Sequence, residues 1–143
     1  MSQCLHCQKQ LESRWQKKYC SNRCQNDFQH VSFISNWKNG KLKPAQLNTI
    51  NISGYIKKYL LEKYGQKCSL CGWNQKHPIS GMVPIEVDHI DGNSENNAES
   101  NLRLICPNCH ALTPNFKNRN RGAGRVKRRN SYIRKGKGNA LKQ

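Results

Sequence analysis

Three residues able to carry out phosphate chemistry lie in two short stretches of the sequence. Asp88 is followed directly by His89, and His110 directly follows Cys109. A carboxylate and an imidazole can share one divalent ion, while a second histidine takes a proton from water. Phosphodiester hydrolysis needs an activated water, neutralised charge and a stabilised leaving group, and these groups can supply all three. The sequence therefore predicts a hydrolytic site built from Asp88, His89 and His110.

The acidic residues of the chain are concentrated around this pair. Five of the eight Asp and Glu residues lie between Glu86 and Glu99, in a chain with 25 Lys and Arg. Acid beside a phosphate-attracting surface is unfavourable unless a cation binds there. A lone Asp-His pair would favour a structural histidine, but this pair precedes an Asn-Leu-Arg stretch by thirteen residues and a C-x2-C-His follows. We therefore favour the functional interpretation.

Eight cysteines form two quartets. The first is C-x2-C followed by C-x3-C, and the second is two C-x2-C pairs, 34 residues apart: Cys4, Cys7, Cys20, Cys24 and Cys68, Cys71, Cys106, Cys109. A disulfide framework would suit a secreted domain, and a redox dithiol would need a βαβ context. Paired thiolates at these spacings instead match tetrahedral zinc, so we predict two structural Zn²⁺ ions. His6 is an alternative ligand in the first quartet, although an exposed loop histidine is favoured.

A β-hairpin is expected to hold Asp88 and His89. β-branched residues favour a strand over 83–90, and Pro84 restricts it to an edge or a first position. Residues 91–93, Asp-Gly-Asn, predict a turn, and the alternation over 101–106 predicts a second strand. The order is therefore strand, polar loop, strand.

A helix is expected to follow the second strand. Pro107 suits its first turn, and we expect it to run through His110 towards Phe116. The second cysteine quartet brackets the hairpin, so its zinc would tie the start of the hairpin to this helix. In a regular strand Asp88 and His89 point to opposite faces, so they can converge only at a strand end or bulge.

An amphipathic helix and a linker are expected upstream. Apolar residues recur at helical spacing from 52 to 64, Ser53 can cap the start, and Gly65 suits the end. Breaker residues lie between 39 and 44. We divide the chain into a zinc knuckle at 1–36, a linker and helix at 37–64, a zinc-stapled hairpin module at 65–121 and a basic tail at 122–143.

Composition argues against several classes of protein. Only 35% of the 143 residues are apolar, so a hydrophobic core alone would give marginal stability. Additional cross-links such as metal ions or disulfides are therefore expected. No stretch approaches the ~18–20 apolar residues of a membrane span, and residues 1–4 begin no signal peptide. The net charge of +17 predicts a polyanion partner. We expect an intracellular, cytoplasmic protein without a membrane.

The C-terminal tail carries most of the excess charge. Residues 117–143 contain eleven Lys and Arg and no acid, with glycines between them. Such a segment is expected to be disordered when free. We predict a DNA-binding arm rather than a merely solvated tail, because the charge is of one sign and rich in arginine. The arm comprises Arg119, Arg121, Arg125, Lys127, Arg128 and Arg129.

Taken together, these stretches resemble the HNH endonucleases. The resemblance rests on Cys68-x2-Cys71-Gly72-Trp73, on Val87 to Asn93 and on Asn101 to Pro114, and covers roughly residues 55–122. It is greatest for small phage-type members with a four-cysteine zinc site, and the upstream knuckle resembles an accessory zinc module. The resemblance implies a ββα-metal fold, here in an α+β chain, and cleavage of DNA to 3′-hydroxyl and 5′-phosphate ends.

The resemblance also implies a role for each site residue. His89 would be the general base that deprotonates the attacking water. Asp88 and His110 would hold a catalytic Mg²⁺ or Mn²⁺ against the scissile phosphate and the leaving 3′-oxygen. Asn101 would brace the loop and orient His89. Many relatives have a lysine-threonine pair after the last histidine, whereas this chain has Leu-Thr-Pro at 112–114, which implies a shorter helix.

The sequence thus predicts a DNA endonuclease or nickase, for which a phage gene in a bacterial host is one fitting source. The main alternative is a non-catalytic, zinc-dependent nucleic-acid-binding protein, since two knuckles and a basic arm would serve it equally well. RNA cleavage is a lesser variant. A pure binder has no use for Asp88, His89 and His110 beside an acidic loop, so catalysis is favoured. Homing, packaging, replication and restriction remain open roles, as does the oligomeric state.

Overall fold

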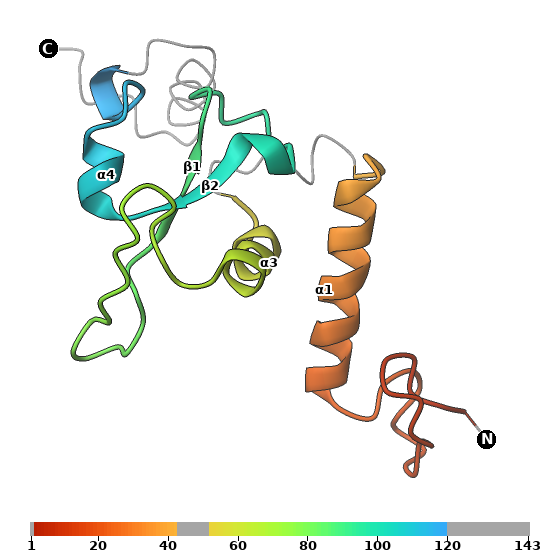
Figure 1. Ribbon diagram of the computed structural model, residues 1–143. Helices are drawn as coiled ribbons and strands as arrows, with labels where there is room; N and C mark the ends of the chain where they lie inside the picture. Colours follow the sequence, from red (N-terminus) through yellow and green to blue (C-terminus); the bar gives the residue numbers. More distant parts are fainter. Residues whose placement is uncertain (1, 43–51, 120–143) are drawn as a thin grey trace, which may run out of the picture. The chain divides into compact units, whose positions relative to one another are not determined.

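The computed structural model describes residues 2–42 and 52–119, which belong to two compact units divided in sequence between residues 43 and 44 (Figure 1). The first unit contains helix α1 (Asn22–Lys38). The second contains α3 (Gly54–Tyr64), β1 (Glu86–His89), the 3₁₀ helix η1 (Glu99–Asn101), β2 (Leu102–Ile105), α4 (Pro107–Ala111) and the 3₁₀ helix η2 (Lys117–Arg119). Short helices with one two-stranded sheet confirm the α+β class. Across the described residues, no helix has the length and apolar character needed to cross a membrane.

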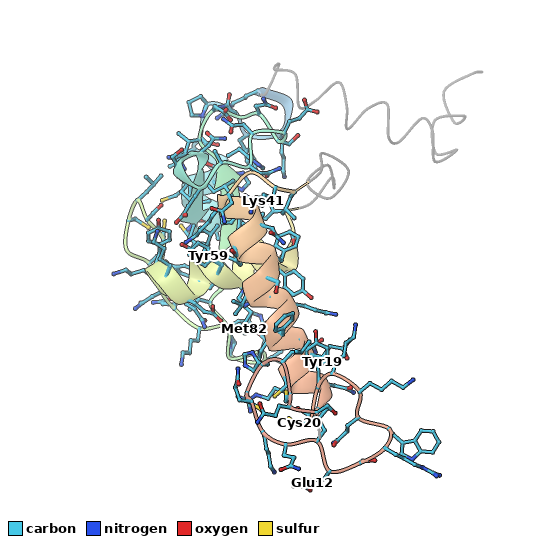
Figure 2. The ribbon with its side chains drawn as sticks, turned by 90° about the vertical axis from the view of Figure 1, so that its right-hand side faces the viewer. Glu12, Tyr19, Cys20, Lys41, Tyr59 and Met82 are labelled. Carbon is cyan, nitrogen blue, oxygen red and sulfur yellow. The ribbon has the colours of Figure 1, made fainter. Side chains whose placement is uncertain are left out.

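The first unit is a cysteine-bearing loop followed by α1, with Cys20 at the N-terminal end of the helix (Figure 2). The helix begins because the Ser21 side chain accepts a hydrogen bond from the Cys24 backbone N–H. The helix ends at Asn39, and Gly40 follows at φ +65°, so these two residues act as the predicted breaker. Tyr19 packs on Phe28 of α1 with ring centroids 5.5 Å apart, which joins the loop to the helix.

Helix α3 forms where the apolar spacing predicted it. The Ser53 side chain accepts a hydrogen bond from the Tyr55 N–H, and Gly65 ends the helix at φ +78°. Ile56 and Leu60, one turn apart, are fully buried, and α3 packs against β2. This helix therefore forms one wall of the core beneath the hairpin.

The hairpin is antiparallel, and both of its strands are shorter than predicted. β1 and β2 pair so that Asp88 lies opposite Arg103 and His89 lies opposite Leu102. The expected strand over 83–90 begins only at residue 86, because Pro84 has no N–H and the Ile85 N–H turns back to the Val83 carbonyl. His89 therefore occupies the end of β1, where a strand side chain can be re-aimed.

Helix α4 contains His110 as expected but ends at Ala111, so the predicted continuation through Leu112 towards Phe116 is wrong. The Thr113 N–H and hydroxyl both donate to the His110 carbonyl at 3.0 and 2.8 Å, which satisfies the helix end. Pro114 follows and disfavours helical backbone at the residue before it. The shorter helix implied by the family resemblance is the one observed, and Pro107 occupies its first turn as expected.

Candidate active site

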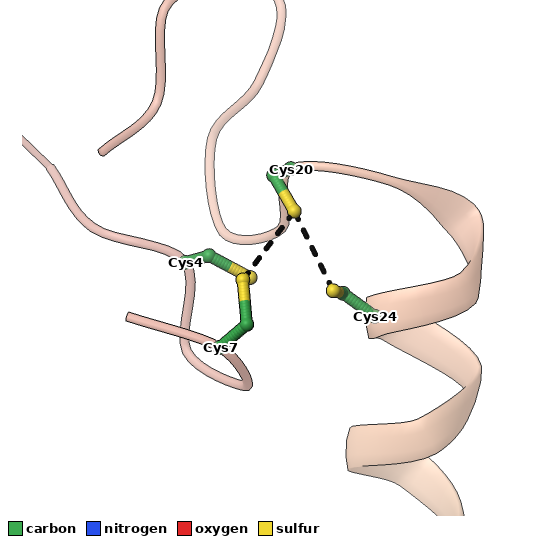
Figure 3. A group of neighbouring side chains, drawn as sticks. All are labelled: Cys4, Cys7, Cys20 and Cys24. Carbon is green, nitrogen blue, oxygen red and sulfur yellow. Dashed lines mark hydrogen bonds between the residues drawn. The ribbon is translucent and has the colours of Figure 1, made fainter. Parts of the chain in front are cut away.

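Each cysteine quartet forms a cluster that fits a zinc ion. In the first, Cys20 Sγ lies 3.6 Å from Cys7 Sγ and 3.4 Å from Cys24 Sγ (Figure 3). All four sulfurs of each quartet lie within 4.8 Å of one another. Tetrahedral zinc with bonds of about 2.3 Å requires sulfurs about 3.8 Å apart, so the spacing matches. His6 is exposed and outside the first cluster.

The second cluster links distant parts of the second unit. Cys71 Sγ lies 3.8 Å from Cys106 Sγ, which joins the loop before the hairpin to the end of β2. The Ser69 N–H also donates to the Leu104 carbonyl at 2.8 Å, so the same loop is bonded to β2. Because Cys109 lies in α4, this cluster fixes the helix relative to the strands.

The thiols are electrostatically prepared for a cation. Backbone N–H groups, chiefly that of Cys7, lower the pKa of Cys4 to about 6. Burial alone would raise the pKa of Cys68, but backbone N–H groups outweigh it and lower that pKa to about 6. Hydrogen bonds with neighbouring thiols raise the pKa of Cys20 and of Cys109 to about 12. All four thiols of a cluster can lose their protons together only if a bound cation offsets the charge, which Zn²⁺ would supply.

Asp88 and His110 are brought together by the packing of α4 against β1. Asp88 Oδ1 lies 3.7 Å from His110 Nε2, and Asp88 is only 8% exposed. Arg103, its partner across the sheet, places both Nε and Nη2 2.8 Å from Asp88 Oδ2. One carboxylate oxygen is thus occupied by the guanidinium, and the other faces the imidazole.

Glu86 contacts the other nitrogen of the same imidazole. It lies two residues before Asp88 on β1, so both side chains project from one face of the strand. Glu86 Oε2 is paired with His110 Nδ1. An ionised carboxylate can only accept hydrogen bonds. Nδ1 of His110 therefore carries the proton, and the lone pair of Nε2 faces Asp88.

This arrangement fits a divalent metal ion. Two atoms 3.7 Å apart, as are Asp88 Oδ1 and His110 Nε2, can both lie about 2.1 Å from one ion. A carboxylate oxygen suits Mg²⁺ or Mn²⁺, and an imidazole nitrogen suits transition-metal ions. A shared ion at these two residues stays a prediction.

His89 has a separate partner. Its Nε2 lies 2.9 Å from Asn97 Oδ1, in the loop between the strands. Because an amide oxygen is an acceptor, Nε2 donates the proton and Nδ1 keeps its lone pair. His89 is half-buried at the end of β1, next in sequence to the carboxylate that faces His110. It is therefore oriented independently of the Asp88–His110 pair.

Asn101 braces the loop that carries the His89 partner. Its Nδ2 donates to Asp91 Oδ1 at 2.9 Å and to the Asn96 carbonyl at 2.8 Å. Its Oδ1 accepts the Asp91 N–H at 3.1 Å. Burial raises the pKa of Asp91, but hydrogen bonds from Asn96, Asn93 and Asn101 outweigh it and hold the pKa below its usual value. Asn101 thus orders the loop and reaches His89 only through it.

The segment after α4 turns back against the site. The Phe116 ring lies edge-on to His110 with centroids 5.1 Å apart. Gly92 has φ +73°, and a Cβ there would lie 2.5 Å from the Asn115 side chain. Glycine is therefore required at 92, and the close approach keeps this segment beside both the loop and the imidazole.

Three residues that contact the site were not predicted from the sequence. Glu86 could have been found from its two-residue spacing to Asp88 along the strand. Arg103 stands in the Asn-Leu-Arg stretch, but only the strand register puts it opposite Asp88. Asn97 gave no signal within its polar loop.

Of the predicted arm, Arg119 lies in η2, and the remainder lies outside the described residues: Arg121, Arg125, Lys127, Arg128 and Arg129.

Comparison with known proteins found matches to the region that contains this hairpin. Residues 68–113 match the family model described as HNH endonuclease. The H-N-H endonuclease F-TflIV of Escherichia phage T5 is 48% identical over 59 residues, which cover 39% of this chain and 24% of that protein. The chain thus spans about a quarter of the length of the curated relative it matches. No solved structure matches the chain.

Proposed function

We propose that this chain, whose residues 68–113 belong to the HNH endonuclease family, is a metal-dependent DNA endonuclease or nickase. It would hydrolyse phosphodiester bonds to 3′-hydroxyl and 5′-phosphate ends. The observation that carries the proposal is the 3.7 Å approach of Asp88 Oδ1 to His110 Nε2, with His89 next to Asp88 at the end of the strand. The relative named as an endonuclease supports the same activity.

Asp88 and His110 would hold the catalytic Mg²⁺ or Mn²⁺. Such an ion neutralises phosphate charge, stabilises the leaving oxygen and lowers the pKa of water. Arg103 fixes the Asp88 carboxylate through its second oxygen, and Glu86 fixes the His110 tautomer. The two four-cysteine clusters would hold structural Zn²⁺ ions, which set the framework and take no part in the chemistry.

His89 would accept the proton of the attacking water at Nδ1. The hydrogen bond from Nε2 to Asn97 Oδ1 leaves Nδ1 as the basic nitrogen. The same hydrogen bond stabilises the imidazolium formed after proton transfer, because the amide oxygen faces the charged ring. Asn101 would support this step indirectly by ordering the loop that carries Asn97.

DNA is the proposed partner, in an intracellular setting. Reduced cysteines are needed for thiolate zinc sites, and the relative is a phage protein. The basic arm that begins at Arg119 would add phosphate contacts, which carry no sequence information. Its contribution stays a prediction.

Plasmid cleavage tests the proposal. Zinc-loaded protein with Mg²⁺ or Mn²⁺ should convert supercoiled DNA into nicked or linear forms. His89→Ala should slow cleavage by about 10²–10⁴-fold, the usual contribution of a general base. His77→Ala is the matched control, because His77 is an exposed histidine of the same unit whose Nδ1 accepts hydrogen bonds from the N–H groups of its own loop. It should cleave like the parent.

Two outcomes contradict the nuclease. Absence of nicked or linear DNA with either metal leaves the non-catalytic nucleic-acid-binding protein as the function. Equal cleavage by His89→Ala and the parent means that His89 is not the base. End-labelling of the products then tests the 3′-hydroxyl and 5′-phosphate assignment, and labelled RNA tests the choice of substrate.

A further inference from the structure

The first unit exposes a tryptophan that its own fold does not use. Trp15 is 78% exposed, whereas Trp37 of the same unit is 7% exposed. Large aromatic side chains contribute most of their free energy when they are removed from water. The Trp15 side chain therefore adds little to the packing of the first unit and is accessible to a partner.

The loop that carries Trp15 is held in one conformation. Gln16 Oε1 accepts the N–H groups of Glu12 and Ser13 at 3.1 and 3.2 Å, and Gln16 Nε2 donates to the Cys20 carbonyl at 2.9 Å. In Figure 2 Glu12 lies beyond the N-terminal end of α1 and Tyr19 lies beside that end, and the hydrogen bond to Cys20 ties the loop to the cysteine cluster. A partner would therefore meet Trp15 on a backbone that these hydrogen bonds already order, which lowers the entropic cost of binding.

The charges around Trp15 are mostly positive. Arg14, Lys17 and Lys18 belong to the same loop, and its one acid, Glu12, lies 3.8 Å from Lys9. Residues 2–42 contain seven Lys and Arg against two Asp and Glu. The Arg14 guanidinium lies over the Trp15 ring, 4.7 Å from its centroid, so a cation lies against one face of the ring.

We propose that the loop of residues 12–18 is a nucleic-acid-binding site in which Trp15 stacks on an unpaired base. Arg14, Lys17 and Lys18 contact the neighbouring phosphates. An exposed ring flanked by cations is the arrangement that binds single-stranded nucleic acid with little sequence preference. A membrane surface fits less well, because the remainder of this loop is polar. The site shares the DNA partner of the proposed function but none of its catalytic residues.

Binding of a labelled single-stranded oligonucleotide tests this site. The zinc-loaded full chain carries His89→Ala throughout, without added Mg²⁺ or Mn²⁺, so the strand stays intact. Trp15→Ala should weaken binding by about 5- to 150-fold, the range for loss of one base–aromatic stack. Trp15→Phe keeps an aromatic face and should retain most of the affinity. Leu5→Ala, also exposed in the first unit at 51%, is the matched control and should bind like the parent.

A strand with abasic positions separates stacking from charge. It keeps the phosphates but has no base for Trp15, so Trp15→Ala should bind it as the parent does. The proposal is overturned if Trp15→Ala binds the normal strand unchanged, or if its loss persists on the abasic strand. A loss confined to anionic phosphatidylglycerol vesicles would also overturn it, in favour of a lipid surface. Retention of two zinc equivalents shows that the variant is folded.

The outcome is independent of the nuclease. Binding is measured in a variant that lacks the proposed general base, so a failure of plasmid cleavage does not affect it. Unchanged oligonucleotide binding with normal cleavage would remove this site and leave the proposed function in place.

Discussion

The two units of the chain close their cysteine clusters in the same way and then continue differently. In the first, Ser21 caps α1 by accepting the Cys24 N–H; in the second, Cys106 caps α4 by accepting the Cys109 N–H at 3.4 Å. α1 then continues for 17 residues, whereas α4 ends after five. In both units the last two ligands therefore lie in the first turn of a helix or just before it.

The residue after the last ligand sets the chemistry available to each unit. In the second unit His110 comes directly after Cys109 and meets the acidic face of β1. Among residues 2–42 there is no strand beyond a single bridge between Gln3 and Gln10, so no acidic face exists there. A four-cysteine cluster is thus a framework, and the paired strands beside it supply the candidate chemistry.

Substitution of one zinc ligand in each unit should give the largest difference in plasmid cleavage rate. Cys109→Ser should reduce plasmid cleavage by at least about 10²-fold, because it frees α4 and removes metal binding that supplies much of the folding free energy. Cys24→Ser should leave the rate at saturating DNA within a few-fold of the parent. Cleavage rates together with zinc content, falling from two equivalents to one in each variant, measure this.

One outcome would contradict the expected difference between the two units. If Cys24→Ser loses cleavage as completely as Cys109→Ser, the first unit is required for the chemistry and the two frameworks are not separable. A Ser69→Ala variant serves as the control, since Ser69 lies within the second cluster's loop but contributes no metal ligand. It should cleave as the parent does.

The cysteine spacing and the order of elements could be predicted from the sequence because they depend on local rules. Thiolate spacing, the Asp-Gly turn and Pro107 each act over a few residues. The pairing of Arg103 with Asp88 could not, because it depends on a strand register that only the folded hairpin defines. The Glu86–His110 contact needs, in addition, the packing of α4 on β1.

Helix α1 could not be predicted for a different reason. Its sequence is polar, and only His30, Ile34 and Trp37 are buried, so its apolar stripe is short and begins late. The start signal, Ser21, stands between two cysteines whose spacing favours a loop. Helix α3 could be predicted because its apolar residues repeat along its whole length between a serine cap and a glycine end.

Substitution of Glu86 should have an intermediate effect, on the Mn²⁺ affinity of the second unit alone. Glu86→Ala removes both the charge and the hydrogen bond to His110 Nδ1, and should weaken Mn²⁺ binding by about 10–100-fold. Glu86→Gln keeps an acceptor oxygen and should lose less. Calorimetric titration with Mn²⁺ measures this directly, and saturating Mn²⁺ should restore most of the cleavage rate.

A structural role for Glu86 makes a different forecast. If it only stabilised the hairpin, Glu86→Ala would lower the cleavage rate without changing Mn²⁺ affinity, and excess Mn²⁺ would not restore activity. Glu62→Ala is the matched control, because Glu62 is an exposed residue of α3 that pairs with Lys58 at 3.8 Å, away from His110. Its Mn²⁺ affinity should equal that of the parent.

The smallest effects are expected from the serine caps, which test whether the units unfold separately. Ser53→Ala removes the cap of α3 and should cost about 1 kcal/mol. Hydrogen exchange should therefore speed up by roughly fivefold across residues 54–64 and remain unchanged across 22–38. Ser21→Ala should give the reverse pattern, because Ser21 caps only α1. If either substitution accelerates exchange in both helices equally, the two units unfold as one cooperative block. The difference between the units in cleavage would then have no counterpart in their folding.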